Sequence, residues 1–355
     1  MSIIAIANQK GGCGKTTTAI NLASALAKNS KKVLLIDLDP QSHATLGLNI
    51  HSQYSIYNCL SPLTNEALKM RDIIMGVEKG FDIAPSNILL STLEQELSDE
   101  IGREARLEEA VFDLRNDYDY ILIDCPPNLG LLTINAIRAA QEIIIPVEPS
   151  QFSLLGVDKL IEIINLIAKR LNHTVKYTLL VTIFDSRLKH SFKILDKIKD
   201  KYSNNLYKTI IHINVKLKEA SLSGQSALEY AKYSRGSKDY MLLAKELIYG
   251  KEASIDAVMR TLIKEKIKEL TEITFSLHEP AAREVYLVGD FNYWKIDQSN
   301  KFKRIEDGQW IKRVNLKPGR YHYKFVIDGE WREDPNNLSK EENNFGGFNS
   351  LIEVQ

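Results

Sequence analysis

This 355-residue sequence has few cysteines and no excess of charge of either sign. Its three cysteines are Cys13, Cys59 and Cys125, and no two of them form a C-x-x-C pair. We therefore expect no disulfide framework. Lysine plus arginine and aspartate plus glutamate both total 46. Because the net charge is zero, no overall field draws the chain onto a polyanion, and any nucleic-acid site must be local.

Long hydrophobic runs and a recognisable signal-peptide pattern are also lacking. The longest apolar runs have the length of strands, well short of the ~20 residues that span a bilayer, and no signal-peptide pattern precedes the first expected strand. We expect a cytoplasmic protein with no integral membrane segment. At 355 residues the chain exceeds the ~250 to 300 residues that one core usually supports, which predicts two domains.

Short β-branched runs alternate with helical stretches over residues 1–250. Near-continuous apolar strands separated by helices are typical of a parallel sheet covered on both faces. The predicted strands are Ile3–Ala7, Val33–Ile36, Tyr120–Ile123, Ile143–Val147, Leu179–Ile183 and Thr209–Ile213. This pattern predicts a doubly wound α/β domain with a mostly parallel sheet.

A glycine-rich loop, Lys10–Thr17, follows the first strand and precedes a helical pattern. Glycines let the backbone wrap phosphates, the helix N-terminus supplies N–H donors, and Lys15 reaches the β- and γ-phosphates. Thr16 is placed to ligate Mg²⁺. The residues expected to hold the nucleotide are Gly11, Gly12, Cys13, Gly14, Lys15, Thr16 and Thr17. The sequence therefore predicts a P-loop NTPase.

A second lysine, Lys10, stands at the start of this loop, and with it the segment resembles the ParA/MinD family of ATPases. The resemblance implies ATP and Mg²⁺ as ligands and a homodimer that forms with ATP. In that dimer Lys10 contacts the phosphates bound by the partner subunit, acting on the same electrostatic principle as an arginine finger. The alternative is an ordinary solvated loop lysine.

Carboxylates follow two of the predicted strands. Asp37 and Asp39 come at the end of the strand Val33–Ile36, and Asp124 comes after Tyr120–Ile123, where ligands of open α/β sheets bind. The family resemblance implies that Asp39 orients the attacking water and that Asp124 holds Mg²⁺ through water, the Walker B role. It implies that Asp37 supports the Mg²⁺ shell or a switch. A buried structural carboxylate is the alternative for each.

Basic residues outnumber acidic ones by seven to three between Lys208 and Lys245. We expect no helix-turn-helix before the P-loop, so the chain resembles the short ParA proteins, which bind DNA non-specifically through this region. The resemblance implies a nucleoid-associated protein whose DNA contacts are phosphate-dominated and salt-sensitive. The candidate DNA-binding residues are Lys216, Lys232, Arg235 and Lys238. Ser221 replaces the family's usual proline here, and a solvated charged face is the alternative.

The pattern changes after residue 250. Apolar residues recur at helical spacing from Ala253 to Leu270, which predicts a linking amphipathic helix over residues 251–271; a membrane-surface helix like that of MinD is the alternative. Residues 272–355 show short alternating strands with Gly and Pro turns, typical of an all-β, immunoglobulin-like sandwich. Its predicted strands are Val285–Val288, Trp310–Val314, Tyr321–Ile327 and Leu351–Val354.

Two segments of this second domain, Val285–Trp294 and Gly319–Trp331, resemble the glycogen-binding module of AMP-activated kinase β-subunits. The apolar C–H face of a sugar packs on aromatic rings while neighbouring polar groups bind its hydroxyls. The resemblance implies the carbohydrate-binding residues Trp294, Lys324, Trp331, Phe345 and Asn349, with Phe345 in the place of the usual leucine. A purely structural or protein-docking sandwich is the alternative.

These features favour a partition or positioning ATPase that is triggered by an unidentified activating partner protein. Its β-domain links it to a cargo, for which glycogen or another α-glucan particle is the candidate. One alternative is a MinD-like membrane-associated ATPase switch. Another is a glucan-binding regulatory scaffold with a degenerate ATPase, against which the complete set of Lys15, Thr16, Asp39 and Asp124 argues.

Overall fold

The computed structural model describes residues 1–250, 271–343 and 346–354. The chain divides into two compact units, residues 1–253 and 254–355. The predicted amphipathic helix over Ala253–Leu270 lies outside the described residues. Within the described residues, none of the helices combines the length and the apolarity that crossing a bilayer requires.

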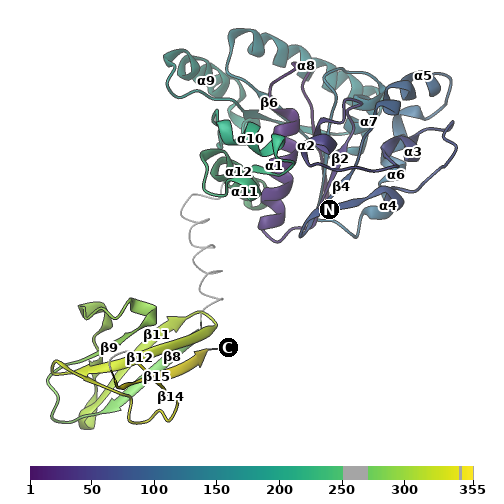
Figure 1. Ribbon diagram of the computed structural model, residues 1–355. Coiled ribbons are helices and arrows are strands. Elements are labelled where there is room, and N and C mark those ends of the chain that lie inside the picture. The colour runs from purple at the N-terminus through teal and green to yellow at the C-terminus, as the bar shows by residue number, and fades with distance from the viewer. Residues whose placement is uncertain (251–270, 344–345, 355) are drawn as a thin grey trace. The chain divides into compact units, whose positions relative to one another are not determined.

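A seven-stranded sheet forms the centre of the first unit (Figure 1). Its strand order is β3-β4-β2-β5-β1-β6-β7, and every neighbouring pair is parallel except β3 with β4. The strands are β1 (Ser2–Ile6), β2 (Val33–Asp37), β3 (Met75–Glu78), β4 (Phe81–Ala84), β5 (Tyr120–Asp124), β6 (Glu142–Val147) and β7 (Lys176–Val181). The predicted mostly parallel α/β fold is confirmed.

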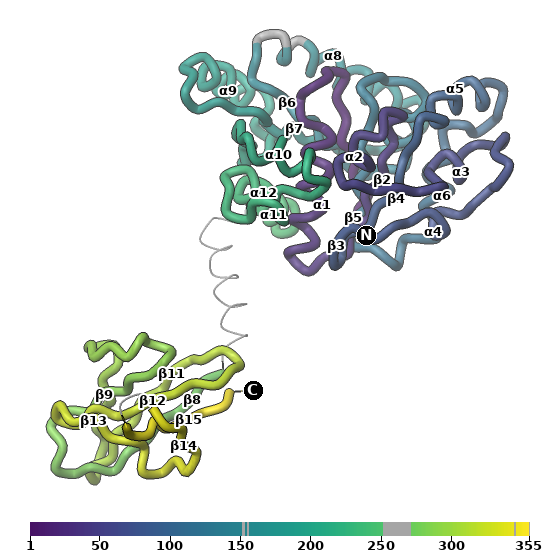
Figure 2. The backbone as a smooth tube through the Cα atoms, viewed as in Figure 1, coloured from purple at the N-terminus to yellow at the C-terminus, as the bar shows by residue number. Residues whose placement is uncertain are grey.

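Helices cover both faces of this sheet, because successive side chains of a strand point to opposite sides. They are α1 (Lys15–Lys28), α2 (His43–Gly47), α3 (Ile56–Leu60), α4 (Met70–Ile73), α5 (Leu93–Glu96), α6 (Arg106–Ala110), α7 (Leu131–Ala139), α8 (Gln151–Arg170), α9 (Lys189–Tyr202), α10 (Val215–Leu222), α11 (Ala227–Tyr230) and α12 (Arg235–Tyr249). Ile4 of β1 belongs to the core under α1 and α12, whereas Ile3 belongs to the core under α7, α8 and α9. The backbone trace shows α10, α11 and α12 gathered beside α1 (Figure 2).

The predicted strand over Thr209–Ile213 is wrong. The segment runs beside β7 and forms an isolated bridge between His212 and Phe184, but it forms no ladder. The N–H groups of this segment have two sets of partners. Those of Ile211 and Ile213 donate to the carbonyls of Val181 and Phe184, whereas Glu246 and Asp239 of α12 accept from the N–H groups of Thr209 and His212, each at 2.9 Å. The segment therefore pairs with the neighbouring chain only locally, because that chain leaves the extended conformation at Ile183, whose φ is 54°.

The second unit consists of two antiparallel sheets, as predicted from the alternating pattern. One sheet has the order β10-β11-β8, and the other has the order β13-β12-β15-β14 with β9 also paired to β12. Aromatic residues from both sheets, among them Phe275, Trp310 and Phe325, form the core between them. The strands are β8 (Thr271–His278), β9 (Val285–Gly289), β10 (Lys303–Arg304), β11 (Gln309–Leu316), β12 (Gly319–Ile327), β13 (Glu330–Arg332), β14 (Lys340–Glu342) and β15 (Phe348–Val354).

Candidate functional site

The glycine-rich loop connects β1 to α1, as the sequence predicts. Gly12 and Gly14 have φ values of 72° and 87°. Glycine adopts this left-handed region freely, whereas a residue that carries a Cβ atom would be strained there. Gly14 is the N-cap of α1, so that the backbone N–H groups of the first turn face the loop. Thr182, just past β7, donates its hydroxyl to the carbonyl of Cys13 at 2.8 Å. The loop is thereby fixed to the carboxyl edge of the sheet.

The two loop lysines have different partners within the chain. The Lys15 ammonium donates to the main-chain carbonyl of Lys10 at 3.2 Å, and Lys15 is buried. The Lys10 ammonium is half exposed and pairs with the Glu148 carboxylate at 2.5 Å. It also donates to the Ser153 hydroxyl at 3.4 Å. Lys15 thus points back into its own loop, whereas Lys10 reaches across to the segment that follows β6.

A cavity of about 760 Å³ adjoins this loop, within the range of ~300 to 1,000 Å³ usual for small-molecule sites. Gly11, Gly12, Gly14, Lys15, Thr16, Thr17 and Asp39 line it, together with residues that the motif does not reveal, such as Thr182, Ile183, His212, Asn214, Leu217 and Tyr240. Ile183 has a φ of 54°, which is strained for a β-branched residue. The second group comes from the chain after β7, and no residue-type signal marked it in the sequence.

Asp37 and Asp124 are direct neighbours in register on β2 and β5, and both are fully buried. Asp37 accepts the N–H and the hydroxyl of Thr45 at 2.8 and 2.7 Å. Burial nevertheless raises the pKa of Asp37 to about 6. Neither carboxylate oxygen of Asp124 accepts a hydrogen bond of ordinary geometry from the described part of the chain, although the Thr16 hydroxyl and the Lys15 charge both favour its ionised form. Burial, reinforced by the charge of Asp37, raises the pKa of Asp124 well above its ordinary value.

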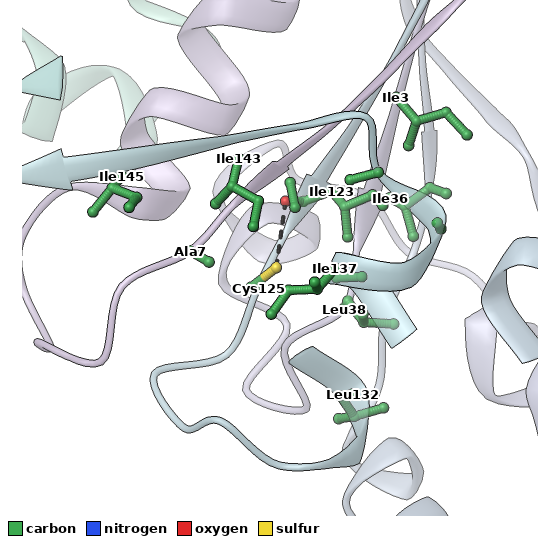
Figure 3. Close-up of a cluster of buried hydrophobic side chains, with 14 of the residues drawn as sticks. Ile3, Ala7, Ile36, Leu38, Ile123, Cys125, Leu132, Ile137, Ile143 and Ile145 are labelled. Atoms are coloured by element: carbon green, nitrogen blue, oxygen red, sulfur yellow. Dashed lines mark hydrogen bonds between the residues drawn. The ribbon is translucent and has the colours of Figure 1, made fainter. Parts of the chain in front are cut away.

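Asp39 is also buried, and its side chain lines the cavity. Its Oδ1 accepts the N–H of Gln41 at 2.9 Å, which fixes the orientation of the carboxylate. Cys125, although it follows Asp124 directly, lies in the apolar core beside Ile137 (Figure 3). Of the residues predicted for the nucleotide site, Gly11, Gly12, Gly14, Lys15, Thr16, Thr17 and Asp39 line one cavity, whereas Lys10, Cys13, Asp37 and Asp124 are not among its lining residues.

Four basic residues, Lys216, Lys232, Arg235 and Lys238, were singled out as DNA contacts, and all four are exposed. We call them the basic cluster. They come from α10, from α12 and from the turn before α12, and these helices pack on one another. Lys216 is partly neutralised by Glu219, whose carboxylate accepts from its ammonium at 2.7 Å.

Two tryptophans of the second unit stack on each other. The rings of Trp294 and Trp331 lie 6.3 Å apart at an interplanar angle of 27°, and 48% of the Trp331 surface is exposed. Trp331 is in register with Val326, whose neighbours Tyr286 and Val288 support the Trp294 ring. These two rings, which we call the tryptophan platform, form an aromatic surface on the outer face of the sheet.

Two of the predicted polar contacts lie on the same face. Lys324 is two residues from Val326 on β12 and pairs with Val288, so its side chain shares the face of the platform. Tyr323 of β12 pairs with Ser350 of β15 in antiparallel register. The residue before Ser350, Asn349, therefore lies next to Lys324, the residue after Tyr323. Asn343 donates to the Asn349 side chain at 3.1 Å. Phe345, the remaining predicted contact, lies outside the described residues.

Comparison with protein families matches each of the two units to a different family. Residues 1–177 match the AAA domain family. Residues 271–355 match the family described as the glycogen recognition site of AMP-activated protein kinase, which agrees with the resemblance stated above for Trp294 and Trp331.

Individual relatives match the first unit. The chain is 40% identical over 247 residues to the sporulation initiation inhibitor protein Soj of Bacillus subtilis, covering 69% of this chain and 97% of that protein. It is 37% identical over 248 residues to the chromosome partitioning protein ParA of Myxococcus xanthus, covering 69% and 87%. Among solved structures, cobyrinic acid a,c-diamide synthase from Mycobacterium smegmatis with bound ATP analogue and magnesium matches with a TM-score of 0.60 at 30% identity, covering 70% and 94%.

Proposed function

Because the chain belongs to the ParA family of partition ATPases, we propose that it is an ATP-dependent switch that dimerises with ATP, binds DNA non-specifically as a dimer and positions a cargo. The observation that carries the proposal is the cavity at the P-loop, where Lys15, Thr16 and Asp39 meet. An unidentified partner protein triggers hydrolysis, and the released protein resets. The protein is then associated with the nucleoid while it holds ATP.

The P-loop and the carboxylates at the neighbouring strand ends fit Mg²⁺ and a triphosphate. Asp124 has two buried oxygens without a hydrogen-bond donor in the described chain, which suits a group that holds a cation, and the Thr16 hydroxyl is the second protein contact. When bound, Mg²⁺ neutralises charge on the phosphate oxygens. Lys15 binds the β- and γ-phosphates, and Asp39 orients the attacking water.

Lys10 completes the site of the partner subunit in this proposal. Its ammonium is half exposed and is held by Glu148 and by the Ser153 hydroxyl. An exposed ion pair of low net stability and one long hydrogen bond must break before Lys10 reaches across a dimer. The Lys10–Glu148 pair is then a resting arrangement, and the positive charge moves to the γ-phosphate of the partner, where it stabilises charge that develops during hydrolysis.

DNA binding is assigned to the basic cluster. The helix α12 that carries Arg235 and Lys238 is joined to the P-loop helix by a hydrogen bond of 3.1 Å between the Tyr240 and Thr18 hydroxyls, both buried. Tyr240 also lines the cavity. A change at the nucleotide therefore has a direct structural connection to the helix that bears two of the four basic residues, and dimerisation doubles the number of such residues per particle.

The tryptophan platform supplies the cargo link, with an α-glucan as the ligand. Two stacked and partly exposed indoles offer the apolar surface that sugar rings pack on, and Lys324 and Asn349 lie on the same face to bind hydroxyls. The proposed cargo is a glycogen-like particle. The MinD-like alternative would place a membrane contact in Ala253–Leu270, which lies outside the described residues.

Binding to random-sequence duplex DNA tests the switch. The full chain is titrated with ATP, ADP or no nucleotide between about 50 and 200 mM salt, where phosphate-dominated binding falls steeply. Wild type should bind only with ATP, and Arg235→Ala should weaken binding about tenfold or more. Lys79→Ala is the matched control, since Lys79 is an exposed lysine in the turn between β3 and β4. Equal binding by wild type under all three nucleotide conditions would overturn the proposal.

A further inference from the structure

A chain of polar contacts fixes one ring of the tryptophan platform. The indole Nε1–H of Trp294 donates to Oδ1 of Asp290 at 3.1 Å. The other oxygen of Asp290 accepts the backbone N–H of His322 at 2.8 Å and lies 2.9 Å from its Nδ1. Trp294 itself has a φ of 58°, a conformation that is uncommon for a bulky residue and has to be held by its surroundings.

His322 also contacts a second carboxylate. Its Nε2 lies 2.5 Å from Oε2 of Glu341, and Glu341 is in register with Asn349 on the neighbouring strand. Arg320 pairs with the other oxygen of Glu341 at 3.4 Å. The imidazole therefore joins the segment that carries Trp294 to the strand beside Asn349, on the face that bears the platform.

Only the protonated imidazole can satisfy both carboxylates. Its two ring nitrogens are then both donors, one toward Asp290 and one toward Glu341, whereas the neutral ring has one donor and must turn a lone pair toward the other carboxylate. The charged groups that face His322 are these two carboxylates and, behind Glu341, Arg320. Lys324 lies two residues further along β12 on the same face.

We propose that protonated His322 is a positioning residue of the glucan site: by bridging Asp290 and Glu341 it holds the Trp294 ring in the platform, so that glucan binding weakens when the imidazole loses its proton. This inference rests on the proposed glucan binding. The hydrogen bond to Glu341, with Asp290 acting in the same direction, raises the pKa of His322 above its ordinary value of 6.5. The bridge is therefore intact below that value and is lost as the pH rises through the raised pKa.

Calorimetric titration of the full chain with maltoheptaose tests the inference. From about pH 6 to about pH 9, wild type should lose affinity roughly three- to tenfold as the imidazole is deprotonated. His322→Gln should bind equally at both pH values, at or below the wild-type affinity at high pH. Asp290→Asn should do the same, because its side chain still accepts from the indole but no longer pairs with a cation. His278→Gln, on β8 of the other sheet, should keep the wild-type decline.

The outcomes separate the inference from the function on which it rests. Measurable maltoheptaose binding that does not change with pH, or a decline that persists in His322→Gln, would overturn the inference alone. If maltoheptaose does not bind at pH 6 or at pH 9, the proposed glucan ligand is wrong. In that case the indole N–H resonance of Trp294 still decides the positioning role: it should shift with pH in wild type and stay constant in His322→Gln, and a shift shared by both proteins contradicts the bridge.

Discussion

Asp37 and Asp124 face each other in register at the carboxyl ends of β2 and β5, and their surroundings differ sharply. Thr45 donates twice to Asp37, while the oxygens of Asp124 are buried without a donor from the described residues. A buried carboxylate that lacks a partner is costly. The pair therefore combines one carboxylate that is held by two hydrogen bonds from Thr45 with one that is disposed to bind a cation.

Replacing the unpartnered carboxylate separates stability from activity. Asp124→Asn should raise the free energy of unfolding of the nucleotide-free protein at neutral pH by about 1 to 3 kcal/mol, because the amide removes the desolvation cost and the repulsion from Asp37 that raise the pKa of Asp124. The same variant should lose about a hundredfold or more of its Mg²⁺-dependent ATP hydrolysis. Urea denaturation in EDTA and a phosphate-release assay provide the two measurements. A variant that is less stable and fully active would contradict both assignments.

The pH dependence of stability should reflect Asp37. Its folded-state pKa of about 6 lies above the unfolded value of 3.8, so the folded protein holds the proton more tightly. Its stabilising contribution is present below about pH 4 and is lost as the pH rises through about 6, a change of about 1 to 3 kcal/mol. Urea denaturation of nucleotide-free protein across this range should show a smaller decline in Asp37→Asn. An identical decline in the variant would show that Asp37 is not the titrating group.

Lys10 and Glu148 offer a matched pair of variants for the dimer. Lys10→Ala should bind ATP but remain monomeric, since Lys15 rather than Lys10 contacts the nucleotide of its own subunit in the proposal. Glu148→Gln removes the charge that holds Lys10 and should dimerise at a lower ATP concentration than wild type. Analytical ultracentrifugation with and without ATP measures both effects. If Lys10→Ala dimerises at the same ATP concentration as wild type, Lys10 is an ordinary solvated loop lysine.

The exposed ring of the platform should dominate glucan binding. Trp331→Ala should weaken binding to glycogen about tenfold or more, because burying an aromatic face contributes on the order of 1 to 2 kcal/mol. Affinity electrophoresis of the full chain in glycogen-containing gels gives the measurement. Arg313→Ala, an exposed position on β11 of the other sheet, is the control and should migrate as wild type does. Unchanged retention of Trp331→Ala would leave the sandwich with a structural or protein-docking role.

Local patterns in the sequence were sufficient for much of the site. The loop from Lys10 to Thr17 has its own conformational signature, because glycines and the start of a helix are encoded within a few residues. The same holds for Asp39 and Asp124, which follow apolar strands whose ends must meet at one edge of a parallel sheet. Trp294 and Trp331 were identified by resemblance, and the sheet register explains why they meet.

Other features depended on contacts between distant segments, which no local pattern encodes. Thr209–Ile213 has the composition of a strand, but the neighbouring chain leaves the extended conformation at Ile183, so that only an isolated bridge forms. Nothing in the sequence indicated that Thr45 stabilises Asp37 or that Thr182 fixes the P-loop.

The sequence by itself therefore determined which chemistry the chain carries: a phosphate-binding loop, carboxylates at strand ends and an aromatic pair. Side-chain type and short-range spacing are sufficient for that, because they follow from the backbone needs of one loop or one strand. The tertiary structure alone decided which of these groups have partners. Lys10 pairs with Glu148, Asp124 has no donor within the described chain, and His322 joins two carboxylates, since hydrogen bonding and burial depend on residues that the fold brings together from far along the chain.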